Sequence, residues 1–289
     1  MKGRFFVSPG NLLILRSESS DTSMEQNAHT DRFIDDYSGE VGLMRKLNWL
    51  TILISFILVT GIICIAQAEG QPGSSDVIGR IVTFGRYEQD GNEANGPEPI
   101  EWIVLDVQEG KALLLSRYGL DHLPYNAEEK NVTWESCSLR KWLNGEFLQA
   151  AFTSEELKSI PEATVDNSKS QCFSRWKNAK GGNDTTDRVF LLSYAEANRY
   201  LGVSWYEDGS EKAQMEATDY AARDAHRRIP GFENPEKRSY CHWWLRSPGA
   251  EQTDASDVTS SGNLVTSGTD SDFPFVRPAI WLDLKVMIQ

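Results

Sequence analysis

The 289-residue sequence is poor in the residue types that build disulfide scaffolds and metal centres, with four cysteines and four histidines. Beyond residue 68 the cysteines are Cys137, Cys172 and Cys241, an odd number at wide spacings. Such a set fits neither a disulfide framework nor a zinc ribbon, and it can form at most one internal bridge. The histidines stand singly rather than at metal-ligand spacing, so we expect no metal and no cofactor.

Basic residues are also scarce relative to acidic ones, with 29 Lys and Arg against 42 Asp and Glu and a formal net charge of -13. Proteins that bind a phosphate backbone need clustered Lys and Arg. We therefore expect no nucleic-acid partner. Hydrophobic residues make up 40% of the chain and aromatic residues 10%, which is enough for one sizeable core.

Long apolar runs are limited to one, from Leu50 to Ile65, which follows Arg45 and Lys46 and precedes Ala66-Gln67-Ala68. A basic start, an apolar middle and a small-x-small end are typical of a secretory signal, and they predict cleavage after Ala68. The run is also near the lower limit for a bilayer-spanning helix, so a retained anchor is the alternative. In both cases the part of the chain after this run faces outward, and membrane contact is restricted to the N-terminal segment.

The sequence therefore divides into four segments. Residues 1–43 lack a sustained apolar period and are either a disordered extension or the result of a start placed too early, with Met44 as the true first residue. Residues 44–68 are the signal peptide or transmembrane anchor. Residues 69–76 are a linker rich in Gly and Ser, and residues 77–289 form a single exported domain.

Strand patterns come at both ends of the exported domain, with helical patterns between them. Two apolar runs joined at Glu109-Gly110 predict a hairpin. Ser193 and Glu196 have the spacing of a capping box, before a helix that Gly202 ends. Further helices are predicted within 138–151 and 216–228. Because strands and helices do not alternate regularly, the pattern favours an α+β fold over a doubly wound sheet.

Six motifs, in order, resemble the domain of unknown function 6273 family of bacterial proteins, common in gut Firmicutes. They are "FGRYEQD", "PIEWIVLDVQEGKALLLSRYGLD", "TWESCSLRKWLN", "DRVFLLSYAEA", "WWLRSPG" and "VRPAIWL". The resemblance covers roughly Val82 to Leu284 and implies no particular activity, since the family has no established one. The segment "ATDYAAR" and the Trp-rich ending resemble the C-type-lectin-like fold shared with sulfatase-modifying enzymes. That likeness implies a mixed domain with twisted antiparallel strands, two or three short helices and long loops.

The segment "YCHWWLRSPG" is the densest group of candidate functional residues. In an extended strand, alternate side chains face opposite ways, so we expect Trp243 in the core and Trp244 with Arg246 on the other face. Similarly, "VRPAIW" places Arg277 and Trp281 on one face, and the lectin-like resemblance implies that both segments lie in one sheet. These four residues form either a buried stacked ladder or the floor of a ligand-binding cleft.

No pattern in the sequence identifies a catalytic residue. Cys241 and His242 are adjacent in a strand and face opposite ways, so they make a poor nucleophile and base pair. The resemblance to sulfatase-modifying oxidases implies a pair of C-terminal cysteines that holds copper. In this sequence, Cys241 is the single cysteine in the corresponding C-terminal half. We therefore expect a non-catalytic cell-surface or secreted module that binds a small-molecule or glycan ligand. The alternative is an exported enzyme, such as a sulfatase-modifying-like oxidase or a hydrolase.

Overall fold

The structure is a computed structural model that describes residues 76–205, 208–228 and 240–287. The chain divides into two compact units, Met1–Gly70 and Gln71–Gln289, and all described residues belong to the second. The predicted extension, the signal or anchor segment and its cleavage site lie outside the described residues. Within the described ranges, no helix is long and apolar enough to cross a bilayer.

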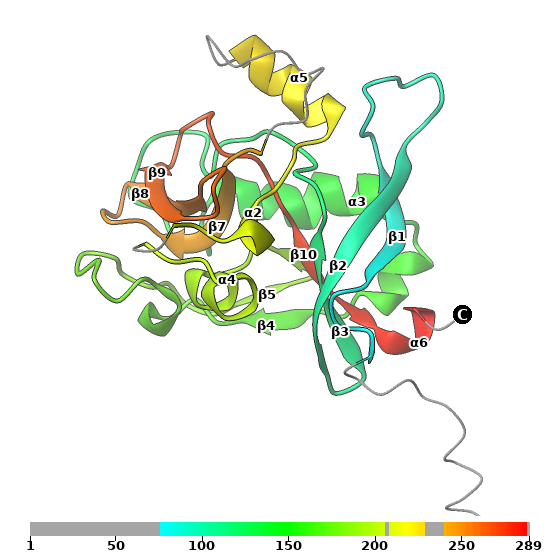
Figure 1. Cartoon of the computed structure of the whole chain (residues 1–289), viewed down its shortest axis with the longest axis horizontal. Helices are drawn as coiled ribbons and strands as arrows, with labels where there is room; N and C mark the ends of the chain where they lie inside the picture. Colours follow the sequence, from blue (N-terminus) through cyan, green and yellow to red (C-terminus); the bar gives the residue numbers. More distant parts are fainter. Residues whose placement is uncertain (1–75, 206–207, 229–239, 288–289) are drawn as a thin grey trace, which may run out of the picture. The chain divides into compact units, whose positions relative to one another are not determined.

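A five-stranded antiparallel sheet contains both the first and the last strand of the described chain (Figure 1). Its strands, in spatial order, are β1 (Ile81–Tyr87), β2 (Glu98–Gln108), β3 (Lys111–Ser116), β10 (Ala279–Asp283) and β6 (Val189–Phe190). The predicted hairpin between β2 and β3 is confirmed. Its turn residues, Glu109 and Gly110, have φ angles of 50° and 76°, because a two-residue turn that matches strand twist needs positive φ at both positions.

Two smaller antiparallel sheets complete the strands. One pairs β4 (Ala163–Val165) with β5 (Thr185–Asp187), and the other joins β7 (Trp243–Pro248), β8 (Asp254–Val258) and β9 (Leu264–Gly268). The expectation that β7 and β10 share one sheet is wrong. The chain between them forms the β8–β9 hairpin, which pairs with β7, whereas β10 lies between β3 and β6.

The helices lie mostly between the early and the late strands, which confirms the α+β class. A continuous helical stretch runs through α2 (Ser138–Trp142), a π-helix (Leu143–Phe147) and α3 (Leu148–Ala151). It is followed by α4 (Tyr194–Leu201), α5 (Asp219–Arg228) and α6 (Leu284–Met287). Short 3-10 helices cover Glu156–Ser159, Lys169–Gln171 and Glu211–Ala213.

The ends of α4 match the sequence prediction in detail. Ser193 and Glu196 form a reciprocal capping box, and Gly202 caps the C-terminus in the left-handed conformation with φ of 71°. A side chain at such φ is strained, so glycine is favoured there. Both ends of α4 are thus set by residues adjacent to it in the sequence.

Candidate functional site

The residues expected to form a ladder or a cleft floor lie in two different sheets. Trp244 and Arg246 belong to β7, whereas Trp281 belongs to β10 and Arg277 precedes it. Trp243 is fully buried, as predicted, but Trp244 is fully buried too. Both faces of β7 are therefore covered, so its alternation does not separate a core face from an open one.

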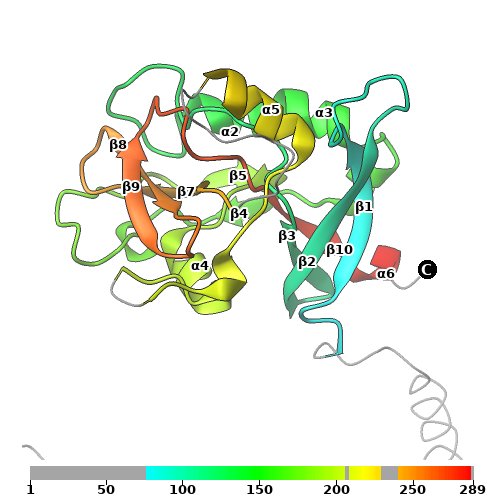
Figure 2. The same ribbon diagram turned by 45° about the horizontal axis from the view of Figure 1, so that its top comes forward.

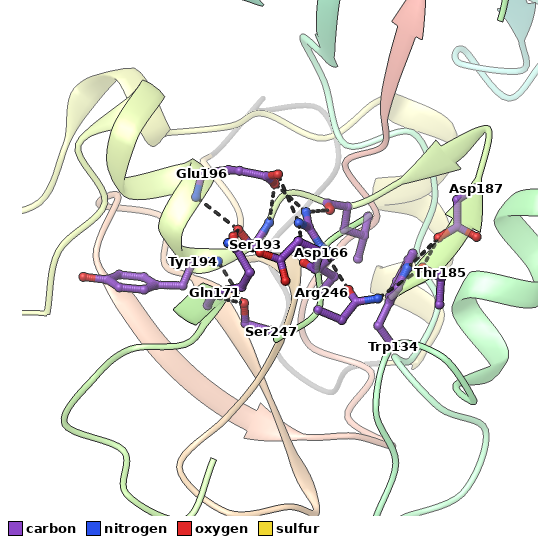
Figure 3. A network of polar contacts seen from close by, with 12 residues as sticks. Trp134, Asp166, Gln171, Thr185, Asp187, Ser193, Tyr194, Glu196, Arg246 and Ser247 are labelled. Carbon is purple, nitrogen blue, oxygen red and sulfur yellow. Dashed lines mark hydrogen bonds and ion pairs between the residues drawn. The ribbon is translucent and has the colours of Figure 1, made fainter. Parts of the chain in front are cut away.

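Arg246 lies in a buried polar network that Figure 3 shows, with 2% of its side chain exposed. Both terminal nitrogens contact the Glu196 carboxylate, with Nη2 donating to Oε1 at 3.0 Å. Nη1 also donates to the Leu191 carbonyl at 2.8 Å, Nη2 to the Asp166 carbonyl at 3.0 Å, and Nε to Asn167 Oδ1 at 3.2 Å. All five guanidinium N–H groups are thus matched by acceptors.

The network continues from Arg246 to the β5 strand through neutral and charged side chains. Asn167 donates to Thr185 at 3.1 Å, and Thr185 donates to the buried Asp187 at 2.7 Å. Trp134 Nε1 and Arg140 Nε also donate to Asp187, at 3.0 and 2.7 Å. The void beside Arg246 measures about 10 Å³, which is room for about one water at most. Arg246 of β7 thus contacts α4 directly through Glu196 and β5 indirectly through Asn167.

Arg277 has a different set of internal partners. Its guanidinium lies 4.9 Å from the centre of the Trp243 ring, and its Nε donates to the Ser116 carbonyl at 3.0 Å. Burial lowers the pKa of Arg277 to about 9. The ring that stacks on the Arg277 guanidinium is thus Trp243 and not Trp281. Trp281 is half-buried and pairs with Leu113 across β10 and β3. A role in ligand contact stays a prediction for these residues.

An open cleft lies elsewhere, between α5 and the α2–α3 stretch, beside the end of β1; Figure 2 shows these elements together. We call it the α5 cleft. Its volume is about 360 Å³. Its lining residues are Tyr87, Asp121, Leu123, Trp142, Glu146, Phe147, Ala150, Tyr220 and Asp224. A neighbouring hollow of about 410 Å³ shares Leu123, Trp142 and Glu146 with it.

Backbone and amide contacts hold the walls of the α5 cleft in place. Asn144, in the π-helix, donates to and accepts from Val189 of β6, at 2.8 and 3.2 Å. The Asp121 carbonyl accepts from the Val276 N–H at 2.9 Å, just before β10. Tyr220 N–H donates to the Gln89 carbonyl at 2.9 Å, which joins α5 to the loop after β1.

Asp121 is the most buried of the three carboxylates in the α5 cleft, at 8% exposed. Its Oδ2 accepts from the Tyr87 hydroxyl at 2.5 Å and its Oδ1 from the His122 N–H at 2.7 Å. Burial raises the pKa of Asp121 above the usual aspartate range, and the Asp224 carboxylate adds to the rise. A carboxyl held this way changes its charge closer to neutral pH than an exposed one does.

His122 lies behind the cleft, fully buried, and packs against Phe275 with ring centres 4.8 Å apart. Its Nε2 contacts the Asp272 carbonyl. Its Nδ1 has no hydrogen-bond partner among the described residues. The carboxylate oxygen Oδ2 of Asp224 lies 3.5 Å from this Nδ1, so a buried ring nitrogen faces a residue that lines the cleft.

Aromatic rings form the rest of the cleft wall. Tyr87 meets Tyr220 edge to face at 6.1 Å between ring centres, and it meets Phe147 at 5.1 Å. Phe147 in turn meets Trp142 at 5.4 Å. These rings come from β1, α2, the π-helix and α5, so the wall exists once those elements have packed.

Sequence reasoning did not propose the α5 cleft residues as a site. A signal was nevertheless present, because Tyr87, Asp121, Trp142 and Tyr220 all fall in motifs that carried the two resemblances. Those motifs indicate the family, and the sequence alone does not show that they form one surface. Their convergence depends on the packing of α5 against the α2–α3 stretch.

The three cysteines of the described residues are buried thiols that are not joined in disulfides. Burial raises the pKa of Cys137 to about 12 and those of Cys172 and Cys241 to about 11. The His242 ring contacts Asp257, with Nδ1 2.9 Å from Oδ2. None of these thiols lines the α5 cleft, and a buried thiol with a raised pKa is a poor nucleophile.

One group of described carboxylates has oxygens close enough together to share a cation: Glu88, Asp90 and Glu98, all within 4.8 Å of one another. They lie at the β1–β2 loop, where Asp90 accepts from the Asn92 N–H at 2.7 Å and Glu98 from the Gln89 N–H at 2.8 Å. The Asp90 and Glu98 carboxylates therefore stabilise the conformation of the loop through hydrogen bonds to its backbone.

The described part of the chain is thus an α+β domain of antiparallel sheets with a buried polar network and a separate acidic, aromatic cleft. The family model described as "Domain of unknown function (DUF6273)" matches residues 109–284. The match covers more than half of the chain, and the chain belongs to this family. No curated protein and no solved structure matches the chain.

Proposed function

We propose that this chain is an exported, non-catalytic cell-surface or secreted module that binds a ligand in the α5 cleft, with a glycan as the first ligand class. The observation that carries the proposal is the α5 cleft, where aromatic rings and carboxylates line about 360 Å³ of open space. Concave sites with aromatic walls and a few convergent polar groups are the usual form of small-molecule sites. The predicted C-type-lectin-like fold belongs to this proposal, and the pairing of early and late strands in one sheet supports it.

The chemistry of the α5 cleft suits a sugar ring. The C–H face of a sugar packs against aromatic rings, as Trp142 and Tyr220 present, and its hydroxyls donate to carboxylates such as Glu146. By contrast, Arg246 and Arg277 are at most 2% exposed and already have internal partners. The cleft is therefore the better candidate for ligand contact.

A glycan array probed with the purified full chain tests the proposal, followed by titration of the glycans that bind. We expect Trp142→Ala to remove binding, because this side chain lines both the α5 cleft and the hollow beside it. Trp281→Ala is the matched control, since Trp281 is another half-buried tryptophan but lies on β10. Loss of binding in the Trp281 variant alone would instead place the site on β10.

Export is the second part of the proposal, and the order of basic, apolar and small residues from Arg45 to Ala68 supports it. N-terminal sequencing of the protein from producing cells should give a mature chain that begins at Glu69. Recovery of a chain that retains Leu50–Ile65 would indicate a membrane anchor.

A hydrolase is the alternative function that a specific observation favours. Asp121 has a raised pKa in the same cleft as Asp224 and Glu146, and glycosidases pair a carboxyl whose pKa is raised with a second carboxyl group. Release of reducing ends from a bound glycan, lost in Asp121→Asn while binding persists, would establish this alternative. The oxidase alternative needs paired thiols, and the described cysteines lie away from the cleft.

A further inference from the structure

The hollow beside the α5 cleft has a different chemical character from the cleft itself. We call it the α2 hollow, because residues of α2 and of the π-helix that follows form part of its wall. Its volume is about 410 Å³, and most of its lining is apolar: Leu123, Pro124, Ala127, Leu139 and Trp142. Its charged lining residues, Lys141 and Glu146, have opposite signs. The polar lining of the α5 cleft consists instead of two tyrosines and three carboxylic acids.

The α2 hollow and the α5 cleft adjoin each other, since Leu123, Trp142 and Glu146 line both. Together they form one groove that is polar at one end and apolar at the other. A purely polar ligand would leave the apolar end in water. A ligand with an apolar group at the matching end would remove that lining from water, which favours binding.

Hydrogen bonds hold the walls of the α2 hollow together. On one side, the chain from Tyr125 to Ala127 is joined to the start of α2. Ser138 N–H donates to Asn126 Oδ1 at 3.1 Å, and Ala127 N–H donates to Ser138 Oγ at 2.9 Å. Leu139 N–H donates to the Tyr125 carbonyl at 3.2 Å. The hollow is thus built into the fold, as ligand pockets usually are.

Gly145 keeps the other side of the α2 hollow open. It lies in the π-helix, Leu143–Phe147, and π-helical segments are rare and frequent at functional sites. Glycine is unfavourable inside a helix relative to alanine. A Cβ on Gly145 would meet no heavy atom within 4 Å beyond its chain neighbours and its own helix backbone. Packing within the described part of the chain therefore does not require glycine here, whereas an open hollow benefits from it.

We propose that the ligand of this groove is an amphipathic glycan, in which a sugar occupies the α5 cleft and an alkyl or acyl chain attached to that sugar occupies the α2 hollow. This inference rests on the proposed glycan-binding function of the α5 cleft. The tyrosine hydroxyls and carboxylates of the cleft bind the sugar hydroxyls. The chain packs against Leu123, Leu139 and Trp142.

Calorimetric titration of the purified full chain with a series of glucosides tests the inference. The series is methyl, butyl and hexyl β-glucoside, with 1-hexanol as the chain without a sugar. Each methylene that enters an apolar site strengthens binding about fourfold. We therefore expect hexyl β-glucoside to bind about tenfold or more tightly than methyl β-glucoside. We expect 1-hexanol to bind more weakly than hexyl β-glucoside, because it makes no contacts in the α5 cleft.

Three variants locate the chain in the α2 hollow. Gly145→Leu fills the open space over Gly145 and should reduce the gain from methyl to hexyl β-glucoside to about twofold or less. Leucine is favoured over glycine in helices, so this variant should fold. Gly145→Ala is the matched control, since it adds a single carbon at the same position, and it should keep most of the gain. Ala150→Leu fills the α5 cleft, which Ala150 lines without lining the α2 hollow, so it should weaken all three glucosides by a similar factor.

The outcomes separate the inference from the proposed function. Equal binding of methyl and hexyl β-glucoside overturns the inference and leaves glycan binding intact. A gain with chain length that Gly145→Leu retains also overturns it, because the chain would then bind outside the α2 hollow. Binding of 1-hexanol as tight as that of hexyl β-glucoside overturns the inference and contradicts the proposed function as well. Failure of all three glucosides to bind overturns the inference, whereas the other sugars of the glycan array still test the proposed function.

Discussion

Replacing Arg246 tests whether it is a structural anchor or a ligand contact. Arg246→Ala leaves the carbonyls of Leu191 and Asp166 and the Oδ1 of Asn167 without their donors. A buried acceptor without a partner costs about 1–3 kcal/mol, so the two acceptors in buried bonds, the Leu191 carbonyl and Asn167 Oδ1, give a loss of at least about 2 kcal/mol. The ion pair with Glu196 adds less than a fully buried pair would, because 29% of the Glu196 side chain is exposed.

We therefore expect Arg246→Ala to lower the free energy of unfolding by about 3–5 kcal/mol, in line with the effect of breaking buried pairs. Urea unfolding followed by tryptophan fluorescence measures it. Arg246→Lys keeps the charge but not the fork of five donors, and should lose part of this amount. Glu196→Gln separates the two roles of Glu196, since glutamine can still accept in the capping box with Ser193.

Two results would refute this reasoning. A loss below about 1 kcal/mol for Arg246→Ala would mean that the guanidinium is not needed to satisfy its neighbours. Normal stability together with lost ligand binding would make Arg246 a ligand contact, as one interpretation of the sequence had it.

Three further measurements test the burial of particular side chains and the single-domain organisation. Trp243→Ala and Trp244→Ala should each lower the free energy of unfolding by about 3–5 kcal/mol, because both rings are fully buried; a small loss for either would contradict its core position. In the native protein at about pH 8, Ellman's reagent should label the described cysteines slowly, and urea should speed the reaction. The folded thiols hold their protons to higher pH than unfolded ones, so their contribution to stability is complete below about pH 9 and declines as pH rises through about 11 to 12. Fast native labelling, or stability that does not decline over this range, would count against the burial. Finally, Val77–Gln289 expressed alone should unfold in one transition, and two separated transitions would show two domains.

The family, the α+β class and several element boundaries could be predicted from the sequence, because they depend on residues close together in the chain. The capping box of Ser193 and Glu196 spans three positions. The turn depends on two adjacent residues, Glu109 and Gly110, which both adopt positive φ. Gly202 ends its helix through its own backbone conformation. Each of these contacts joins residues that are close in the chain, so the sequence indicates it without knowledge of the tertiary packing.

The facing of β7 and the make-up of the α5 cleft were decided by the tertiary structure. Alternation along β7 predicts two faces but not which of them other segments cover, and Trp244 is buried because the chain near Leu123 and Tyr125 packs on it. Arg246 pairs with Glu196, which lies 50 positions away in the sequence. The residues around Glu196 indicate its role in the helix cap but do not indicate this ion pair. The cleft likewise gathers Tyr87, Asp121 and Tyr220 from β1, a loop and α5, because the packing of hydrophobic faces, rather than any local pattern, sets which distant side chains meet.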